Sequence, residues 1–169
     1  MPDAAAWELV KKSISASCQL FDGHLSEVDK ADWFRMPTEG VTHVAWQAGH
    51  IAISTYGIGL RLQRGERPAD AELGLTNYKE LFGQGSTPSA DASIYPSAEE
   101  LHATIKKVFA QVDQEMVEWP LSDLDSALDP PHPRFKTRFE FLAFLPAHNF
   151  MHFGQVSLLR RLFGNAPLR

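Results

Sequence analysis

The stretch TRFEFLAFLPAHNFMHFGQVSLLRRLFG, residues 137–164, has the apolar spacing of an amphipathic helix and contains two histidines four residues apart. Thr137 is a candidate N-cap and Gly164 a candidate stop, so the helix is expected to fill the whole stretch. We predict an apolar stripe made of Phe141, Phe144 or Leu145, His148, His152, Gln155, Leu159 and Leu162. Because residues i and i+4 lie one above the other on a helix, both imidazoles are expected to point into the protein interior.

Three segments upstream also show helical periodicity, and no segment has the alternating pattern of a strand. The first two cover residues 4–22 and 42–64. The third begins with a capping box, a serine followed three residues later by a glutamate, and ends before Pro120. The expected N-caps of these three helices are Asp3, Thr42 and Ser97.

Four amphipathic helices of about 20 residues each predict an all-α fold, a four-helix bundle, in a single domain over residues 1–169. The connection between the second and third helices, residues 65–96, is long and rich in Gly, Pro, Ser and Asp. Connections of that length are usually functional or cross the bundle. Such a crossing would let the helices on either side of it run parallel.

The second helix is expected to present His50 on its inward face, which we predict to contain Trp46, His50, Ile53, Gly57 and Leu60. It also holds three glycines, Gly49, Gly57 and Gly59, each costing about 1 kcal/mol relative to alanine in a helix. Either a backbone or a ligand approaches this helix closely, or the neighbouring packing merely tolerates the glycines. Both interpretations stay open from the sequence.

Three inward imidazoles on two helices, His50, His148 and His152, predict a site for one divalent metal ion. A shared cation would satisfy buried ring nitrogens that otherwise need hydrogen-bond partners. The alternative is three core histidines bonded to backbone or water, because H-x-x-x-H spacing alone is only moderately specific. Small neighbours, among them Gly49 and Gly154, favour the metal, since they allow the close approach that Zn–N bonds of about 2.0–2.1 Å require.

The other histidines are weaker candidates. His43 lies two turns before His50 on nearly the same face and is a second candidate for any role given to His50. His24 and His132 lie beside turn residues, and His102 lies beside the apolar stripe of the third helix, so all three are expected at the surface. A zinc peptidase of the H-E-x-x-H type is excluded, because Asn149 stands where its catalytic glutamate would be.

The composition and charge of the chain limit the partners, the disulfides and the location that can be expected. The chain is 44% hydrophobic and 22% charged with a net charge of −5, which gives no electrostatic reason to expect nucleic acid or an anionic membrane. Cys18 is the only cysteine, which precludes an intramolecular disulfide and indicates a buried structural thiol. Neither a signal peptide nor a membrane-spanning apolar run is found, so a cytoplasmic location is expected.

Several stretches resemble the DinB superfamily, whose members are described as metal-dependent hydrolases of the DinB/YfiT type. The segment VAWQAGHIA, residues 44–52, is similar to the part of the second helix that supplies the first ligand. FGQGS (82–86) with YPS (95–97) is similar to the connection into the third helix. HNFMHFGQ (148–155), continuing to LLRRLFG (158–164), is similar to the H-x-x-x-H-x-G-Q end of the last helix and is the most specific match.

The resemblance implies an up-down-down-up bundle with metal ligands His50, His148 and His152, and homodimers are common in the family. Relatives with assigned activities include transferases and isomerases that use a small intracellular thiol. This chain departs from many relatives by having Asn149 in place of an acidic residue, which removes a carboxylate from near the site. Pro146, inside the last helix, is expected to kink it. Either the kink aims His148 or it is an incidental feature of the helix.

Three neutral histidines without a carboxylate leave a coordination position open, as in catalytic sites, and suit Zn²⁺ or Ni²⁺. Gln47, Asn149 and Gln155 are the candidate hydrogen-bond partners of the ligands, and Tyr56 with the long connection is expected to line the entrance. One hypothesis is a metal-dependent hydrolase or thiol S-transferase that activates a small thiol or water toward a small-molecule substrate. Another is a non-catalytic stress protein that binds metal or a small ligand. A third is a structural bundle whose histidines only pack.

Overall fold

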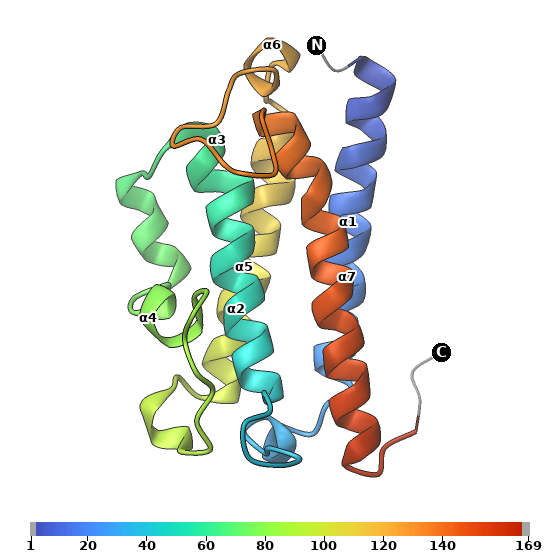
Figure 1. Ribbon diagram of the computed structural model, residues 1–169, viewed down its shortest axis with the longest axis vertical. Helices are drawn as coiled ribbons and strands as arrows, with labels where there is room; N and C mark the ends of the chain where they lie inside the picture. The colour runs from blue at the N-terminus through green and yellow to red at the C-terminus, as the bar shows by residue number, and fades with distance from the viewer. Residues whose placement is uncertain (1–2, 167–169) are drawn as a thin grey trace.

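The computed structural model describes residues 3–166, and its regular elements are helical. Within that range, β pairing is limited to one isolated bridge between Ala127 and Thr137. Four long helices lie side by side, with α2 and α5 running opposite to α1 and α7 (Figure 1). Their bounds are Ala4–Ser26 (α1), Val44–Tyr56 (α2), Ala98–Met116 (α5) and Arg138–Leu162 (α7). No described helix combines the length and the apolarity needed to span a bilayer.

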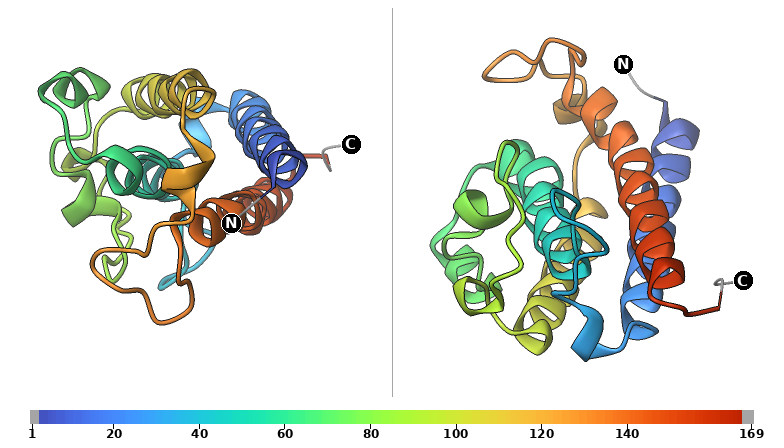
Figure 2. Two further views of the ribbon diagram at one scale, coloured as in Figure 1. Left: turned by 90° about the horizontal axis from the view of Figure 1, so that it is seen from above. Right: turned by 60° about the horizontal axis from the view of Figure 1, so that its bottom comes forward.

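The short elements fill the connections and include the 3₁₀ turn Lys30–Asp32 and α6 (Leu121–Leu124). Seen end-on, the segment after α2 lies outside that helix, on the side away from α1 (Figure 2). This segment, predicted only as a long connection, contains a 3₁₀ turn (Pro68–Leu73), α4 (Tyr78–Phe82) and a second 3₁₀ turn (Ala92–Ile94). Tyr78 and Phe82 of α4 are fully buried, so the connection contributes to the core.

Three of the four predicted helix starts are confirmed by their capping contacts, whereas α1 continues to Ser26, four residues beyond its predicted end. Asp3 accepts the amide hydrogen of Ala6, Ser97 and Glu100 form the capping box, and Thr137 accepts from the amide of Glu140. The prediction of Thr42 as the cap of the second helix is wrong: α2 begins at Val44 and is capped by His43. The two neighbours could each supply an acceptor, and the extended backbone at His43 directs its imidazole at the Trp46 amide.

The buried face of α7 differs from the predicted stripe. Six of its eight buried residues follow one another in alternating steps of three and four: Leu142, Leu145, Asn149, His152, Val156 and Leu159. The other two are Pro146 and Arg160. Gln155 and Leu162, which we placed on the stripe, are exposed. His148 is half-buried at the edge of the buried face. The predicted stripe therefore mixed the face that packs in the core with the adjacent face that borders the site.

Two of the three glycines in the second helical segment answer the question of close approach. A Cβ on Gly49 would collide with the ring of Phe82, and one on Gly59 would lie 3.0 Å from Val112. Nothing lies within 4 Å of the corresponding position at Gly57. Gly57 begins a π-helical turn, Gly57–Arg61, which joins α2 to α3 (Leu62–Arg64). Gly49 and Gly59 thus serve close packing, whereas Gly57 faces open space.

The cap of α2 should make the protein sensitive to acid. His43 is fully buried, and burial lowers the pKa of its imidazole to about 4. Its Nδ1 accepts from the Trp46 amide and its Nε2 donates to the Ser89 carbonyl, both at 3.0 Å. Protonation of Nδ1 removes the cap, and an unfolded histidine has a pKa of about 6.5. The stabilising effect of the neutral ring is therefore complete above pH 6.5 and is lost as the pH falls toward 4.

We expect this linkage to remove about 2 kcal/mol of stability at pH 5. The variant His43→Asn keeps a capping side chain that does not titrate. Urea unfolding of the metal-free protein at pH 7 and pH 5 measures the difference. The variant should lose less stability than the wild type on acidification, and an equal loss in both would rule out His43 as the sensitive group.

Candidate metal centre

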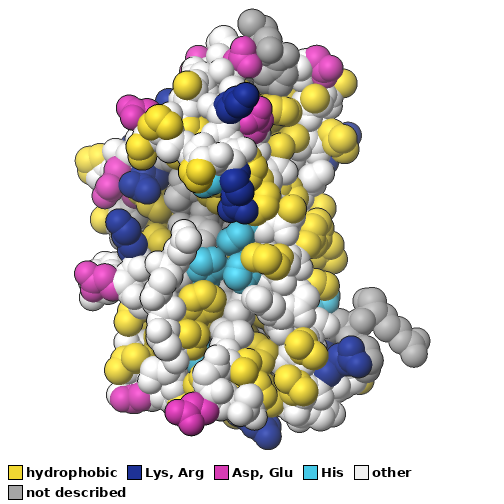
Figure 3. All heavy atoms as spheres, in the orientation of Figure 1, with side chains coloured by type: hydrophobic (Ala, Val, Ile, Leu, Met, Phe, Trp, Pro, Cys, Tyr) yellow, Lys and Arg dark blue, Asp and Glu magenta, His cyan; other side chains and the backbone are white. Residues whose placement is uncertain are grey.

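The three histidines that were predicted as metal ligands meet at one point between α2 and α7. His50 comes from α2, and His148 and His152 come from α7. One ligand atom from each ring lies within 4.8 Å of the others, and the Nε2 atoms of His50 and His148 are 3.4 Å apart. His152 is buried, whereas His50 and His148 are partly exposed. Figure 3 shows a group of histidine side chains reaching the surface near the middle of one face.

Hydrogen bonds fix which nitrogen of two rings is free. The Nδ1 of His50 lies 2.7 Å from the carbonyl oxygen of Phe82, which can only accept, so Nδ1 carries the hydrogen. The Nδ1 of His152 likewise donates to the Oε1 of Gln47 at 2.5 Å. Gln47 is oriented in turn by donating its amide hydrogen to the Thr42 hydroxyl at 2.9 Å. Both rings therefore present a lone pair at Nε2.

The free nitrogens suit a metal ion better than they suit one another. Two imidazole nitrogens bound tetrahedrally at about 2.0–2.1 Å lie about 3.3 Å apart, close to the 3.4 Å between His50 and His148. An N–H···N hydrogen bond between those two rings would explain that distance equally well. It would still leave Nε2 of His152 buried without a hydrogen-bond partner among the described residues. An orphaned buried acceptor costs about 1–3 kcal/mol, so packing alone does not account for His152.

The pKa values of the three imidazoles are lowered, which keeps the rings in the neutral form that can bind a metal ion. Burial lowers the pKa of all three imidazoles, to about 4 for His148 and about 3 for His152, with the neighbouring rings adding to the effect on these two. Each ring is thus neutral at pH 7 and retains a lone pair. Within the described residues, the cluster contains only histidines, without a carboxylate.

The three predicted hydrogen-bond partners behave differently. Gln47 is buried and holds His152, as described above. Asn149 is fully buried and donates to the Ser17 hydroxyl at 3.1 Å, which ties α7 to α1. Its Oδ1 and the Nδ1 of His148 both lack a well-formed hydrogen bond, although Asn149 raises the pKa of His148. Gln155 is exposed and has the smallest influence on the pKa of His152, which it raises.

Two neighbours of His50 were given no role at the site by the sequence analysis, although it placed Trp46 on the same helix face. The indole of Trp46 stacks on the His50 ring with centroids 4.8 Å apart and planes inclined by 10°. The hydroxyl of Ser54 lies 3.4 Å from the Nε2 of His50. Both residues lie four positions from His50 on α2, a spacing that places them on its face and could have identified them. The Phe82 carbonyl is a backbone group far away in sequence, and residue patterns carry no signal for it.

The remaining histidines lie outside the cluster, including His43, the second candidate. The others, His24, His102 and His132, were expected at the surface and are partly exposed there. His24 lies inside α1, with its ring centroid 3.8 Å from that of Phe153. His102 donates a hydrogen bond from its Nε2 to the Asp22 carboxylate at 2.7 Å. Cys18 is buried as predicted, and burial raises the pKa of its thiol to about 12.

Comparison with known proteins identifies a family and a similar fold. Residues 14–156 match the family described as the DinB superfamily. A crystal structure of a conserved protein from Enterococcus faecalis superimposes with a TM-score of 0.65 and 19% sequence identity, covering 94% of this chain and 97% of the other. That likeness concerns the fold. No curated protein matches the chain.

Proposed function

Because this chain belongs to the DinB superfamily and brings three neutral imidazoles to one point, we propose that it is a metal-dependent enzyme acting on a small molecule. The observation that carries the proposal is the buried, unpartnered Nε2 of His152 beside two further imidazole nitrogens. His50, His148 and His152 are the proposed ligands. Zn²⁺ and Ni²⁺ are the proposed ions, since imidazole suits both.

When bound, such an ion supplies Lewis-acid chemistry that lowers the pKa of a coordinated water or thiol toward neutrality. The protein's own groups prepare the site for it. Phe82 and Gln47 hold the rings of His50 and His152 in the tautomer that presents Nε2. Trp46 covers one face of the His50 ring and limits its rotation. The proposed reaction is thiol transfer to a small electrophile or hydrolysis of a small substrate.

The proposal also covers the topology of the bundle and the pairing of two copies of the chain. The opposed directions of the long helices support an up-down-down-up four-helix bundle. Four apolar side chains of α7 are exposed: Phe150, Met151, Leu158 and Leu162. Exposed apolar patches often mark contact surfaces, and we propose that this one pairs two copies of the chain. The net charge of −5 supports a small-molecule partner over nucleic acid.

The test compares metal-loaded with chelator-treated protein against a panel of low-molecular-weight thiols and small electrophiles. We expect turnover only with the metal-loaded protein, and we expect the unmetallated protein to recover activity when Zn²⁺ or Ni²⁺ is added back. The variant Gln19→Leu, at an exposed position of α1, serves as a control and should react as the wild type does. Equal rates with and without metal would contradict the proposal.

A second function is favoured by one observation. The described cluster holds no carboxylate that could act as a general base beside the metal. A non-catalytic protein that binds metal or a small ligand would have no need of one. This alternative predicts saturable binding of metal without turnover of any thiol or electrophile in the same panel.

A further inference from the structure

The wall of a large cavity begins one helical turn after His50, and none of the three clustered histidines lines it. Its volume is about 930 Å³, and it lies between the last turns of α2 and the segment that contains α4. Ile53, which lines it, is one turn after His50 on α2. On the opposite wall, Lys79 is one turn before Phe82, whose carbonyl holds His50. Two parts of the cavity wall therefore lie within one helical turn of His50 or of the residue that holds it.

The π-helical turn shapes one wall of this cavity. Gly57 and Arg61, its first and last residues, both line the cavity. Nothing lies within 4 Å of the position that a Cβ on Gly57 would occupy, so this part of the wall is left open. Single π turns inside α-helices occur frequently at functional sites. At about 1.5 Å per residue, Gly57 lies about 10 Å and Arg61 about 16 Å along the axis from His50.

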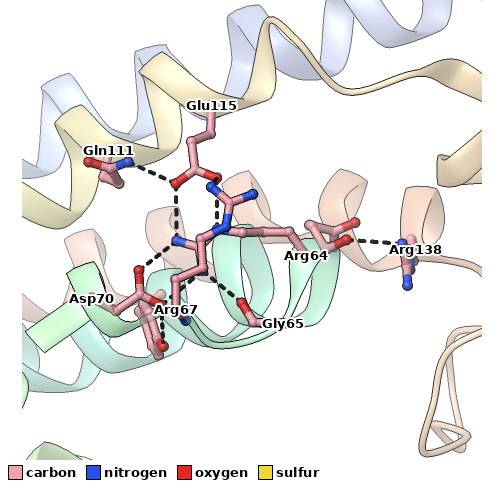
Figure 4. Close-up of polar contacts among 9 residues, drawn as sticks. Arg64, Gly65, Arg67, Asp70, Gln111, Glu115 and Arg138 are labelled. Carbon is pink, nitrogen blue, oxygen red and sulfur yellow. Dashed lines mark hydrogen bonds and ion pairs between the residues drawn. The ribbon is translucent and has the colours of Figure 1, made fainter.

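One carboxylate in the wall is already neutralised. Asp70 accepts two hydrogen bonds from the guanidinium of Arg64, at 2.7 and 2.8 Å, and one from the Tyr56 hydroxyl at 2.9 Å. Arg64 also pairs with Glu115 at 2.7 Å, and Glu115 is in turn 3.3 Å from Arg67 (Figure 4). Two arginines thus balance two carboxylates in this network, which adds no net charge to the cavity.

The charges that remain in the wall are mainly positive. Arg61, Lys79 and Glu66 line the cavity outside the network. Arg61 and Lys79 are exposed, and neither forms an ion pair with the described part of the chain. Two unpaired cations in one cavity of a chain with a net charge of −5 are suited to an anion. The planar guanidinium of Arg61 favours a carboxylate, which it can bind through two parallel hydrogen bonds.

We propose that this cavity binds an organic carboxylate, with the positive charges of Arg61 and Lys79 attracting the anion and the guanidinium of Arg61 holding the carboxylate. This assignment of a substrate class rests on the proposed function, whereas binding of the anion itself does not require a metal. Ile53 and Gly57 supply the apolar, open stretch of wall along which the carbon chain lies.

The test is calorimetric titration with a panel of short mono- and dicarboxylates and with the neutral amide of each. We expect saturable binding of at least one acid by the wild type, weaker binding at higher salt, and no binding of the matching amide. The double variant Arg61→Met/Lys79→Met should bind that acid at least tenfold more weakly. Arg161→Met, at an exposed position of α7, removes a charge elsewhere and should leave the affinity unchanged.

Three outcomes overturn the proposal: no acid binds, acid and amide bind equally, or the double variant keeps the wild-type affinity. Circular dichroism confirms that each variant is folded before it is titrated. The variant His152→Ala separates this proposal from the metal-dependent function. If it and the wild type bind the acid equally while neither takes up metal, the carboxylate site stands and the metal-dependent function fails.

Discussion

Replacing His152 with alanine should abolish stoichiometric binding of Zn²⁺ and leave the helical content unchanged. His152 is the only ligand candidate whose Nε2 is buried and unpartnered, and its tautomer is fixed by Gln47. Removal leaves two imidazoles, which are insufficient for a site of three protein ligands. The loss in affinity should exceed the roughly 10–100-fold that follows removal of an outer hydrogen-bond partner.

A graded series makes this prediction specific. Gln47→Leu removes the acceptor for the His152 Nδ1 hydrogen, and we expect it to weaken zinc binding by about 10–100-fold. Gln19→Leu changes an exposed side chain of α1 in the same way and should bind zinc as the wild type does. Competition with a chromophoric chelator measures all three affinities. Similar affinities for wild type and His152→Ala would remove His152 from the ligand set.

Replacing Arg64 with methionine should destabilise the metal-free protein by about 3–5 kcal/mol, the cost of leaving buried charges unpaired. The side chain of Arg64 is 7% exposed, and those of Asp70 and Glu115 are 9% and 11% exposed. Hydrogen bonding to the Arg64 guanidinium is the largest of the effects that lower the pKa of Asp70 to about 2. Methionine fills a similar volume but leaves two buried carboxylates facing each other.

The neighbouring Arg67 offers the matched control. Its side chain is 54% exposed, and it reaches the same Glu115 at 3.3 Å. Exposed ion pairs contribute about 0–1 kcal/mol, so Arg67→Met should have a small effect. Urea unfolding at pH 7 measures both variants. A further variant that combines Arg64→Met with Asp70→Asn and Glu115→Gln should recover part of the loss, and equal effects of the two arginine variants would contradict the role assigned to burial.

The helices could be predicted from sequence because their ends depend on local chemistry. Asp3, Ser97 and Thr137 cap amide groups three residues away, and such contacts leave a recognisable pattern. The same local signal was ambiguous at Thr42, where the adjacent His43 is the cap instead. Periodicity predicted that α7 is amphipathic but misplaced Gln155, because a helix bordered by both a core and an open site has two inward faces.

The histidine cluster could be predicted because its members repeat at helical spacing and match the family's motif. What holds them could be predicted only in part. Gln47 lies one turn before His50, yet it bonds the ring of His152 on the facing helix. The Phe82 carbonyl and the cavity depend on how α4 packs on α2, with Gly49 against the Phe82 ring. Contacts of this kind arise from tertiary packing between segments far apart in the chain.

X-ray absorption spectroscopy at the zinc edge, on protein expressed without an affinity tag and loaded with one Zn²⁺ per chain, tests the metal centre most directly. We predict three imidazole nitrogens at about 2.0–2.1 Å and one exchangeable oxygen ligand from water. A first shell with fewer than three imidazoles, or one that contains sulfur or protein carboxylate, would contradict the assignment of His50, His148 and His152 as the ligands.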